Sequence, residues 1–321
     1  MKTIYLCERP ENVKNVYNTA DLCYNKADIL NAPDDFKETE HIFSTWGMPQ
    51  FNEAEIKTYL PNLKAVFYGA GSVQIFARPF LNCGVKVFSA WAANAVPVAE
   101  YTVAQMILAN KGFYQSSRIA KTGDRKRAST YFHSCPGNYG AKVGIIGAGM
   151  IGKLVINMLK AYHLQVLVFD PFLPDEKAEE LGVEKTSLEE VFSQCQVVSN
   201  HLANNEQTKR MLNKALFETM LPYATFINTG RGAQVIEDDL INVLKTRPDL
   251  TALLDVTFPE PPEQDSEFYT LDNCILTPHI AGSSGNEVQR MGAYMKEEYK
   301  NFIENKPCKY EVTLDMLKTM A

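Results

Sequence analysis

Short apolar runs alternate with polar, helix-like segments over the first hundred residues. Residues 3–7, 41–46, 64–69 and 85–89 are apolar runs that predict buried strands. The segment 51–63 between two of these runs is typical of a helical connection that ends near Pro61. A chain in which strands alternate with helices forms a parallel α/β sheet. We therefore predict such a sheet for the first part of the chain.

The second half of the chain repeats this alternation more regularly. Strands are predicted at 142–147 and 165–170, with a helix at 150–162 between them. The apolar residues of that helix form one stripe, namely Ile151, Leu154, Val155, Met158, Leu159 and Tyr162. Strand-like runs at 196–201, 224–230, 251–257 and 273–279 continue the pattern. Together they predict a Rossmann-type, doubly wound parallel sheet.

Helix starts and connectors can be located as well. Ser187 with Glu190, and Ser284 with Glu287, have capping-box spacing, and the second pair is expected to open a final helix. Residues 96–114 predict a long helix with Pro97 in its first turn, where proline is tolerated. Residues 117–140 are polar, basic and rich in turn formers, so we predict a connector that runs over the surface.

Length and charge limit the classes of function. The 321 residues are enough for two domains, and 45% hydrophobic with 22% charged residues is ordinary for a soluble globular protein. A net charge of −6 argues against a nucleic-acid partner. The basic run in 117–140 (Arg118, Lys121, Arg125, Lys126 and Arg127) could suggest one. No aromatic residues interleave with these cations, so we interpret the run as a solvated face.

The cellular setting is inferred from cysteines and apolar runs. The seven cysteines are scattered without a CxxC spacing, which argues against a thiolate metal site and favours reduced thiols. No apolar run approaches the ~18–20 residues that a membrane span needs. The first residues become polar too soon for a secretory signal. We therefore expect a cytoplasmic protein with no metal and no membrane contact.

A glycine motif at 147–152 predicts a dinucleotide site. Gly147, Gly149 and Gly152 form a GxGxxG that closes a strand and opens a helix, and Met150 and Ile151 lie within it. The glycines permit a tight turn, close approach to a pyrophosphate, and close packing of helix on strand. Asp170 ends the next strand, where a carboxylate binds ribose hydroxyls and repels a 2′-phosphate, so NAD is favoured over NADP. The alternatives are a ligand-free glycine turn and, for Asp170, a cap or turn residue.

Three later strand ends carry candidate chemistry. Arg231 follows one strand in a glycine-flanked turn, Glu260 lies in a proline-rich loop after another, and His279 ends a third. Arginine can bind a carboxylate through two hydrogen bonds, histidine can exchange a proton near neutral pH, and glutamate can orient the histidine. This set suits reduction of a 2-oxo acid. Each residue also has a structural interpretation: a surface ion pair for Arg231, an exposed charge for Glu260, and a packed or capping side chain for His279. His201 is expected to have a structural or cofactor-side role.

These motifs resemble the D-isomer-specific 2-hydroxyacid dehydrogenases. GAGMIG with Asp170, NTGRG (228–232), LDVTFPEPP (254–262) and TPHIAG (277–282) occur in the family's order. YGAGSV (68–73) and NAVPVAEYTVAQMIL (94–108) are similar to its substrate loop and first inter-domain helix. The resemblance implies a flavodoxin-like α/β substrate domain from residues 1–100 and 283–321, and an NAD-binding domain from 101–282. It also implies an active site in the cleft and a homodimer formed through the cofactor domain.

The resemblance also implies a role for individual residues. Arg231 matches the family's substrate-binding arginine, Glu260 its paired acid and His279 its acid/base. Thr229 and Asp255 match positions on the nicotinamide side, and Ala70, Gly71 and Asn94 match the substrate side. The chain departs from the family pattern at Tyr101, where histidine is common, and at Ala203 and Asn204, where proline and leucine are common. These departures put the shape of the cleft and of the cofactor loop in question.

Two functions remain open at this point. The first is an NAD-dependent dehydrogenase of a small 2-hydroxy or 2-oxo acid, in which the D-configuration rests on the resemblance alone. A neutral tail, as in glyoxylate, hydroxypyruvate or a branched oxo acid, fits the few cations near 68–73 and 91–96. The second is an NAD(H)-sensing, corepressor-like binding protein without catalysis. Oxidation of formate is disfavoured because the family members that perform it have glutamine where this chain has Glu260.

Overall fold

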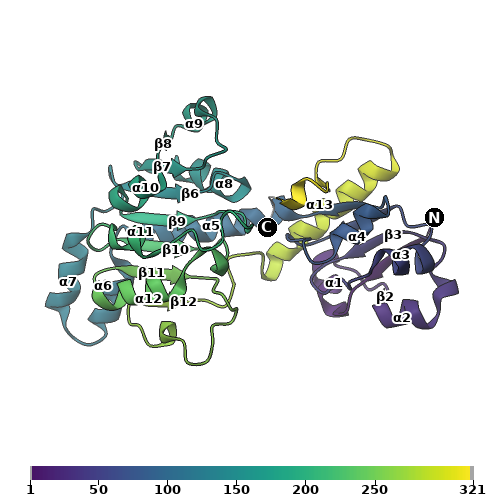
Figure 1. Cartoon of the computed structure of the whole chain (residues 1–321), viewed down its shortest axis with the longest axis horizontal. Helices are drawn as coiled ribbons and strands as arrows, with labels where there is room; N and C mark the ends of the chain where they lie inside the picture. The colour runs from purple at the N-terminus through teal and green to yellow at the C-terminus, as the bar shows by residue number, and fades with distance from the viewer. Residues whose placement is uncertain (1, 319–321) are drawn as a thin grey trace. The chain divides into compact units, whose positions relative to one another are not determined.

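The computed structural model describes residues 2–318 (Figure 1). The chain divides into two compact units: one is built from the chain up to Ala95 together with the stretch from Ser283 onward, and the other is Val96–Gly282. The sequence led us to expect the first boundary between residues 100 and 101. The division falls at Ala95, within helix α5 (Trp91–Ala109). Each unit has its own sheet and cores, and each is described by itself.

The first unit contains a six-stranded sheet in the order β13-β5-β4-β3-β1-β2. Its strands are β1 (Lys2–Leu6), β2 (Cys23–Tyr24), β3 (Thr39–Ser44), β4 (Ala65–Tyr68), β5 (Lys86–Ser89) and β13 (Glu311–Val312). Its helices are α1 (Pro10–Tyr17), α2 (Lys26–Asn31), α3 (Glu53–Tyr59), α4 (Ala77–Asn82) and α13 (Val288–Ile303), with short 3-10 turns η1 (Pro33–Asp35), η4 (Gly285–Glu287) and η5 (Met316–Lys318). The strand pairs are parallel except β13 with β5. The four strands predicted for this part are confirmed.

The sheet of the first unit is buried on both faces. Successive residues of a strand point to opposite faces, so neighbours in β3 and β4 enter different cores. Ile42 and Val66 pack into a cluster that includes residues of α2, α3 and α4. Phe43 and Phe67 pack on the other side with residues of α1 and α13. Burial on both sides explains why these strands are continuous apolar runs in the sequence.

The second unit contains a seven-stranded, fully parallel sheet in the order β12-β11-β10-β9-β6-β7-β8. Its strands are β6 (Lys142–Ile146), β7 (Gln165–Phe169), β8 (Glu184–Lys185), β9 (Val197–Asn200), β10 (Thr225–Asn228), β11 (Thr251–Leu254) and β12 (Cys274–Leu276). Its helices, after α5, are α6 (Phe113–Ala120), α7 (Arg125–Ser134), α8 (Met150–Leu159), α9 (Asp175–Leu181), α10 (Leu188–Gln194), α11 (Lys214–Glu218) and α12 (Glu237–Thr246), with η2 (Gly232–Gln234) and η3 (Glu267–Tyr269). The predicted Rossmann-type sheet is confirmed.

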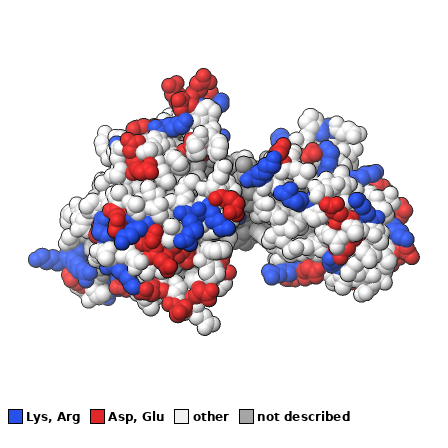
Figure 2. Space-filling model, viewed as in Figure 1, with Lys and Arg blue, Asp and Glu red and all other residues white. Residues whose placement is uncertain are grey.

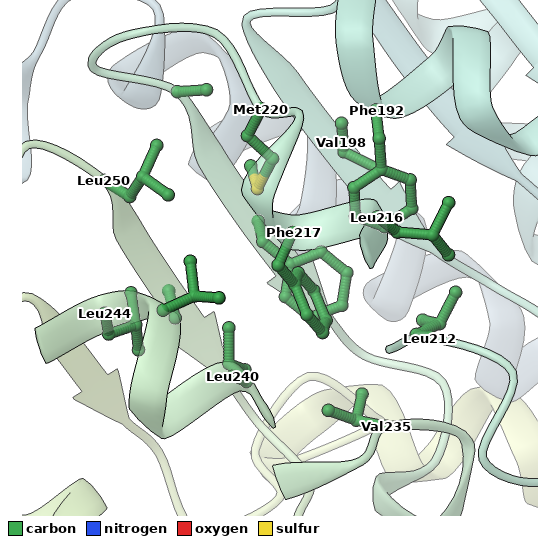
Figure 3. Close-up of a cluster of buried hydrophobic side chains, with 14 of the residues drawn as sticks. Phe192, Val198, Leu212, Leu216, Phe217, Met220, Val235, Leu240, Leu244 and Leu250 are labelled. Carbon is green, nitrogen blue, oxygen red and sulfur yellow. The ribbon is translucent and has the colours of Figure 1, made fainter. Parts of the chain in front are cut away.

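Two cores cover the faces of this second sheet. One contains buried residues of α5 and α8, and the other contains residues of α10, α11 and α12. Figure 3 shows the latter, in which Phe192 and Phe217 lie among leucines with their ring centroids 5.5 Å apart. The strand order reverses at β6, which lies between β9 and β7. In doubly wound sheets, ligands bind at the carboxyl ends of strands next to such a reversal.

Two local predictions were wrong. The segment 117–140 is largely helical, because Asp124 caps α7 by accepting a hydrogen bond from the Arg127 amide at 2.9 Å. Few residues of the segment 117–140 are buried, Ala128 among them. Because most of its side chains are exposed, the segment has the polar composition of a connector although it is helical. Pro97 lies inside α5, which begins at Trp91. Because proline has no amide hydrogen, the Ala93 carbonyl four residues earlier receives no helical hydrogen bond from Pro97.

The surface carries charges of both signs. On the face drawn in Figure 2, lysines and arginines lie among aspartates and glutamates. Arg118, from the basic run, forms an ion pair with Asp272. Within residues 2–318, no helix is long and apolar enough to cross a membrane. In the same residues, no group of three or more His, Cys, Asp or Glu side chains is placed to hold a metal ion.

Candidate active site

The glycine motif forms the turn between β6 and α8. Gly147 has a φ of 92°, and a Cβ there would lie 2.9 Å from the carbonyl oxygen of His201. A Cβ on Gly152 would overlap the carbonyl oxygen of Gly147, so helix and strand pack at backbone distance. Gly149 has open space on its Cβ side, with no atom within 4 Å. The three glycines therefore fit the turn, the packing and the open approach that a pyrophosphate requires.

Asp170 lies beside this turn, at the end of β7. Its Oδ2 accepts a hydrogen bond from the Ala148 amide at 2.7 Å, and its Oδ1 accepts one from the Phe172 amide at 2.8 Å. No basic side chain within residues 2–318 forms an ion pair with it. Met150 is exposed and Ile151 is partly buried at the start of α8. The motif thus presents a fixed carboxylate next to an open glycine turn, as a ribose and a pyrophosphate require.

Arg231 follows β10 in a turn held by buried amide side chains. The Asn228 side chain accepts from the Gly230 amide at 3.1 Å and donates to the Arg231 carbonyl at 3.3 Å. The Arg231 side chain donates from Nη1 to the Gly230 carbonyl at 2.7 Å. Burial lowers the pKa of the guanidinium below its usual value, and the charge of Glu260 acts in the opposite direction. The guanidinium remains charged near neutral pH and retains donors for a carboxylate.

Asp255, at the end of β11, organises the segment that carries His279. Its Oδ1 accepts from the Thr277 hydroxyl at 2.6 Å and from the Ile280 amide at 2.8 Å, and its Oδ2 accepts from the Ala281 amide at 2.9 Å. The His279 amide donates to the Asp255 carbonyl at 3.0 Å. His279 has a φ of 55°, a left-handed conformation that is uncommon for a residue other than glycine. The bonds around Asp255 therefore hold this backbone in place.

The structure brings His279 and Glu260 into contact. His279 Nδ1 lies 2.6 Å from Glu260 Oε1, and the two side chains are 47% and 41% exposed. Because Nδ1 faces the carboxylate, Nε2 is the nitrogen left to exchange a proton with a ligand. A Cβ on Gly232 would overlap the Thr257 carbonyl group, so the Arg231 turn packs directly on the loop that carries Glu260. Arginine, glutamate and histidine are thereby supplied from the ends of three adjacent strands.

The predicted substrate-side residues lie in the first unit. The Ser89 hydroxyl donates to the Ala70 carbonyl at 2.9 Å and to the Gly71 carbonyl at 2.6 Å. A Cβ on Gly71 would lie 3.5 Å from Nδ2 of Asn94, whose Oδ1 accepts from the Ser283 amide at 2.9 Å. Ala70, Gly71 and Asn94 therefore lie together just after the carboxyl ends of β4 and β5.

Tyr101 and Ala203, where the chain departs from the family pattern, form hydrogen bonds to residues that neighbour the candidate site. The Tyr101 hydroxyl lies 3.2 Å from the Thr277 hydroxyl, which in turn donates to Asp255. In the other departure, the Ala203 carbonyl accepts from Nε2 of Gln234 at 2.9 Å and from the Thr208 hydroxyl at 2.6 Å. Tyr101 therefore joins the hydrogen bonds that Asp255 makes to the segment carrying His279. The loop at 203–204 is hydrogen-bonded to Gln234, in the turn that follows Arg231.

Two residues that support the site were not expected from the sequence. Gln234 accepts from the Arg231 amide at 3.1 Å and from Asn200 Nδ2 at 2.6 Å. Glu237 Oε1 accepts from the Phe258 amide at 2.7 Å, and burial raises its pKa to about 7. The only sequence signal for either was a polar residue close after a glycine-rich strand end. Such residues are common in exposed loops, so this signal does not distinguish buried positions.

His201 is buried, as its structural interpretation requires. Its Nε2 lies 3.0 Å from the Ser199 hydroxyl and its Nδ1 3.4 Å from the Thr229 hydroxyl. Burial lowers the pKa of its imidazole to about 3. The Thr229 hydroxyl also lies 3.4 Å from that of Thr102. His201 therefore stays neutral at physiological pH and positions Thr229.

Comparison with known proteins identifies the family to which the chain belongs. Residues 103–281 match the model of a family described as D-isomer specific 2-hydroxyacid dehydrogenase, NAD binding domain. The chain belongs to this family. The resemblance inferred from the motifs is confirmed, and the second unit contains the family's NAD-binding domain, as the cofactor prediction requires.

The relatives of this chain within the family are named as different dehydrogenases. A D-3-phosphoglycerate dehydrogenase of Archaeoglobus fulgidus is 29% identical over 83% of this chain and 50% of its own length. An (S)-sulfolactate dehydrogenase of Chromohalobacter salexigens is 30% identical over 74% of this chain and 77% of its own. This chain spans about half the length of several of the curated relatives that it matches. A D-mandelate dehydrogenase of Rhodotorula graminis is 21% identical with a TM-score of 0.79 over 97% of each chain, which shows a common fold.

Proposed function

We propose that this chain is an NAD-dependent dehydrogenase that interconverts a small D-2-hydroxy acid and the corresponding 2-oxo acid. The contact of 2.6 Å between His279 and Glu260 carries the proposal. It gives a histidine with one nitrogen fixed by Glu260 and the other left for a ligand, and the loop that carries Glu260 packs against the Arg231 turn. Membership of a family of dehydrogenases supports the same reaction class.

The proposed roles follow from the geometry. Arg231 binds the substrate carboxylate through two parallel hydrogen bonds. His279 gives a proton from Nε2 to the carbonyl oxygen of the 2-oxo acid and takes one back from the hydroxyl in the reverse direction. Glu260 holds the imidazole at Nδ1 and fixes its orientation. Asp255 positions the His279 backbone through its bonds to residues 277–281.

The cofactor residues are proposed on the same basis. Gly147, Gly149 and Gly152, with Met150 and Ile151, would hold the pyrophosphate at the start of α8, and Asp170 would accept the ribose hydroxyls. Thr229 and Asp255 would line the nicotinamide side. Bound NAD(H) supplies or takes up the hydride at C2 of the substrate. The reaction then balances, because one hydride and one proton are added to each carbonyl.

The remaining expectations belong to the proposal as well. We assign the first unit as the substrate domain and the second as the cofactor domain, with Ala70, Gly71 and Asn94 on the substrate side. We also propose a homodimer in the cytoplasm. Size-exclusion chromatography with light scattering would test the dimer, and a monomer of 36.1 kDa would refute it.

Turnover tests the proposed reaction directly. NADH absorbance is followed with a panel of 2-oxo acids, with NADPH in parallel. We expect His279→Ala and Arg231→Ala each to lower kcat/KM by at least about 10²-fold while NADH still binds. His163→Ala and Arg127→Ala are matched controls, because both side chains are exposed and lie away from these strand ends. Wild-type rates in the two site variants would refute the assignment.

The alternative, an NAD(H)-sensing protein without catalysis, finds no support in the comparisons. It predicts NADH binding without turnover on any 2-oxo acid, and a partner whose affinity follows the NADH/NAD ratio. The same panel therefore separates the two functions.

A further inference from the structure

The loop that carries Glu260 has few attachments of its own. Thr257 is buried against the Gly232 backbone, but the residues that follow it, 258–261, are exposed. Three of the five residues from Phe258 to Pro262 are prolines, which have no amide hydrogen to donate. Side-chain packing and backbone donors therefore contribute little to the position of Glu260. A partner for the Phe258 amide matters more here than in a loop with many amide donors.

Glu237, the first residue of α12, provides this partner. Its Oε1 accepts from the Phe258 amide at 2.7 Å. The helix that carries Glu237 is fixed, because its buried leucines pack into a core of the second unit. At the other end of the loop, the Tyr269 hydroxyl donates to the Pro262 carbonyl at 3.2 Å. The exposed stretch is thus attached near both ends, and Glu260 lies between the two attachments.

The strength of the attachment to Phe258 depends on the charge of Glu237. A hydrogen bond to a carboxylate is roughly twice as strong as one between neutral groups. Burial raises the pKa of Glu237 to about 7, and the bond from the Phe258 amide acts in the opposite direction. Glu237 therefore changes its charge near neutral pH, where an ordinary glutamate stays ionised.

Titratable groups on two elements interact with Glu237. The charge of Asp238, next to it on α12, also raises its pKa. Cys274, on β12, has a thiol pKa of about 12, raised by burial and by the charge of Glu237, so this thiol is neutral near pH 7. Asp239, in the same first turn of α12, accepts from the Lys214 amide at 2.9 Å. Within residues 2–318, no basic side chain forms an ion pair with Glu237 that would keep it ionised.

We propose that Glu237 is a positioning residue for proton transfer: its carboxylate holds the loop that places Glu260 against His279. This inference rests on the proposed dehydrogenase function and adds a residue that acts through Glu260. Glu260 in turn fixes the His279 imidazole at Nδ1. Because a displacement of about 1 Å can cost about 10²-fold in rate, a looser loop slows proton transfer while the glycine turn still binds NADH.

The pH dependence of 2-oxo acid reduction tests the proposal. In this direction His279 donates a proton, so its own titration can only lower kcat/KM as the pH rises. Loss of the proton from Glu237 has the opposite effect, because the carboxylate holds the loop more firmly. Glu237→Gln keeps a neutral acceptor at all pH values. We therefore expect the ratio of wild-type to Glu237→Gln kcat/KM to be about one at low pH and to rise at least about fivefold, with a midpoint near pH 7.

Three further variants separate positioning from a general loss of structure. Glu237→Ala removes the acceptor, so kcat at about pH 8 should fall at least about tenfold with NADH affinity retained, and the glutamine variant should recover part of this loss. Asp238→Asn should move the midpoint to lower pH, because the charge of Asp238 raises the pKa of Glu237. Glu263→Gln, at an exposed glutamate just beyond the loop, is the matched control and should keep the wild-type profile.

A wild-type to Glu237→Gln ratio that stays constant with pH would overturn the inference, as would a wild-type kcat in Glu237→Ala. Loss of NADH affinity in Glu237→Ala along with turnover would show a merely structural role and overturn it as well. In each of these cases the active wild type leaves the dehydrogenase standing. Inactivity of the wild type with every 2-oxo acid would instead refute the proposed function, and the inference with it.

Discussion

Gly149 and Gly152, three positions apart in the cofactor turn, should respond in opposite ways to the same added methyl group. Gly149 has no atom within 4 Å of its Cβ position, and its φ of −71° is accessible to alanine. Gly149→Ala should therefore leave the stability of the apo protein unchanged or raise it by up to about 1 kcal/mol, because alanine restricts the unfolded chain. The open space is where we place the pyrophosphate. We expect the affinity for NADH to fall at least about tenfold, or about 1.4 kcal/mol.

Gly152→Ala tests packing before any cofactor binds. Its Cβ would overlap the Gly147 carbonyl oxygen, and the nearest side-chain atom, of Ile145, lies 3.5 Å away. The obstacle is therefore backbone, which can give way only if α8 moves from β6. Overpacking of this kind costs about 1–3 kcal/mol. In a domain of this size, each kcal/mol lowers Tm by roughly 2–4 °C.

The assay pairs urea unfolding of both apo variants with NADH titration followed by fluorescence. Stability lost in Gly152→Ala and retained in Gly149→Ala, with NADH affinity lost in the latter, is the expected pattern. Wild-type NADH affinity in Gly149→Ala would show that the dinucleotide does not use the open side of the turn. Wild-type stability in Gly152→Ala would show that the contact between helix and strand is not as close as described.

Three further predictions concern the same unit. Gly232→Ala should push the Glu260 loop away by about 1 Å and lower kcat/KM about 10²-fold with NADH affinity retained, and an unchanged kcat/KM would contradict this. Asp170→Ala should lower the kcat/KM ratio of NADH to NADPH at least about tenfold, because the carboxylate no longer repels a 2′-phosphate; an unchanged ratio would show that another residue selects the cofactor. His201 has a pKa of about 3 when folded, against about 6.5 for an ordinary histidine. Below pH 6.5 the unfolded chain binds a proton that the folded chain does not, so stability is full above that pH and falls by up to about 1.4 kcal/mol per unit toward pH 3. Urea unfolding of His201→Gln should lack this slope, and parallel pH curves for variant and wild type would refute the argument.

Much of the fold follows from local patterns. Both capping boxes, at Ser187 and at Ser284, form as their spacing predicts. The apolar runs become strands because both faces of each sheet are buried. The glycine turn could be recognised from its GxGxxG spacing between a strand and a helix, although the backbone that Gly147 approaches belongs to the distant His201. Predictions failed in α7, an exposed helix with the composition of a connector, and at Pro97, which lies inside α5 and not in its first turn.

Some features of the candidate site could likewise be predicted from local patterns, and others could not. Strand-end positions and residue types predicted Arg231, Glu260, His279 and Asp170, since parallel strands bring their carboxyl ends to one edge. Only the tertiary structure decided that Glu260 meets His279 across 19 residues of chain, and that Asp255 holds the His279 backbone. The same holds for Tyr101, whose partner Thr277 is 176 residues away. Periodicity and turn chemistry act over a few residues, so the sequence by itself determined the elements and their ends. Contacts between distant segments depend on how the elements pack, and no local pattern encodes them.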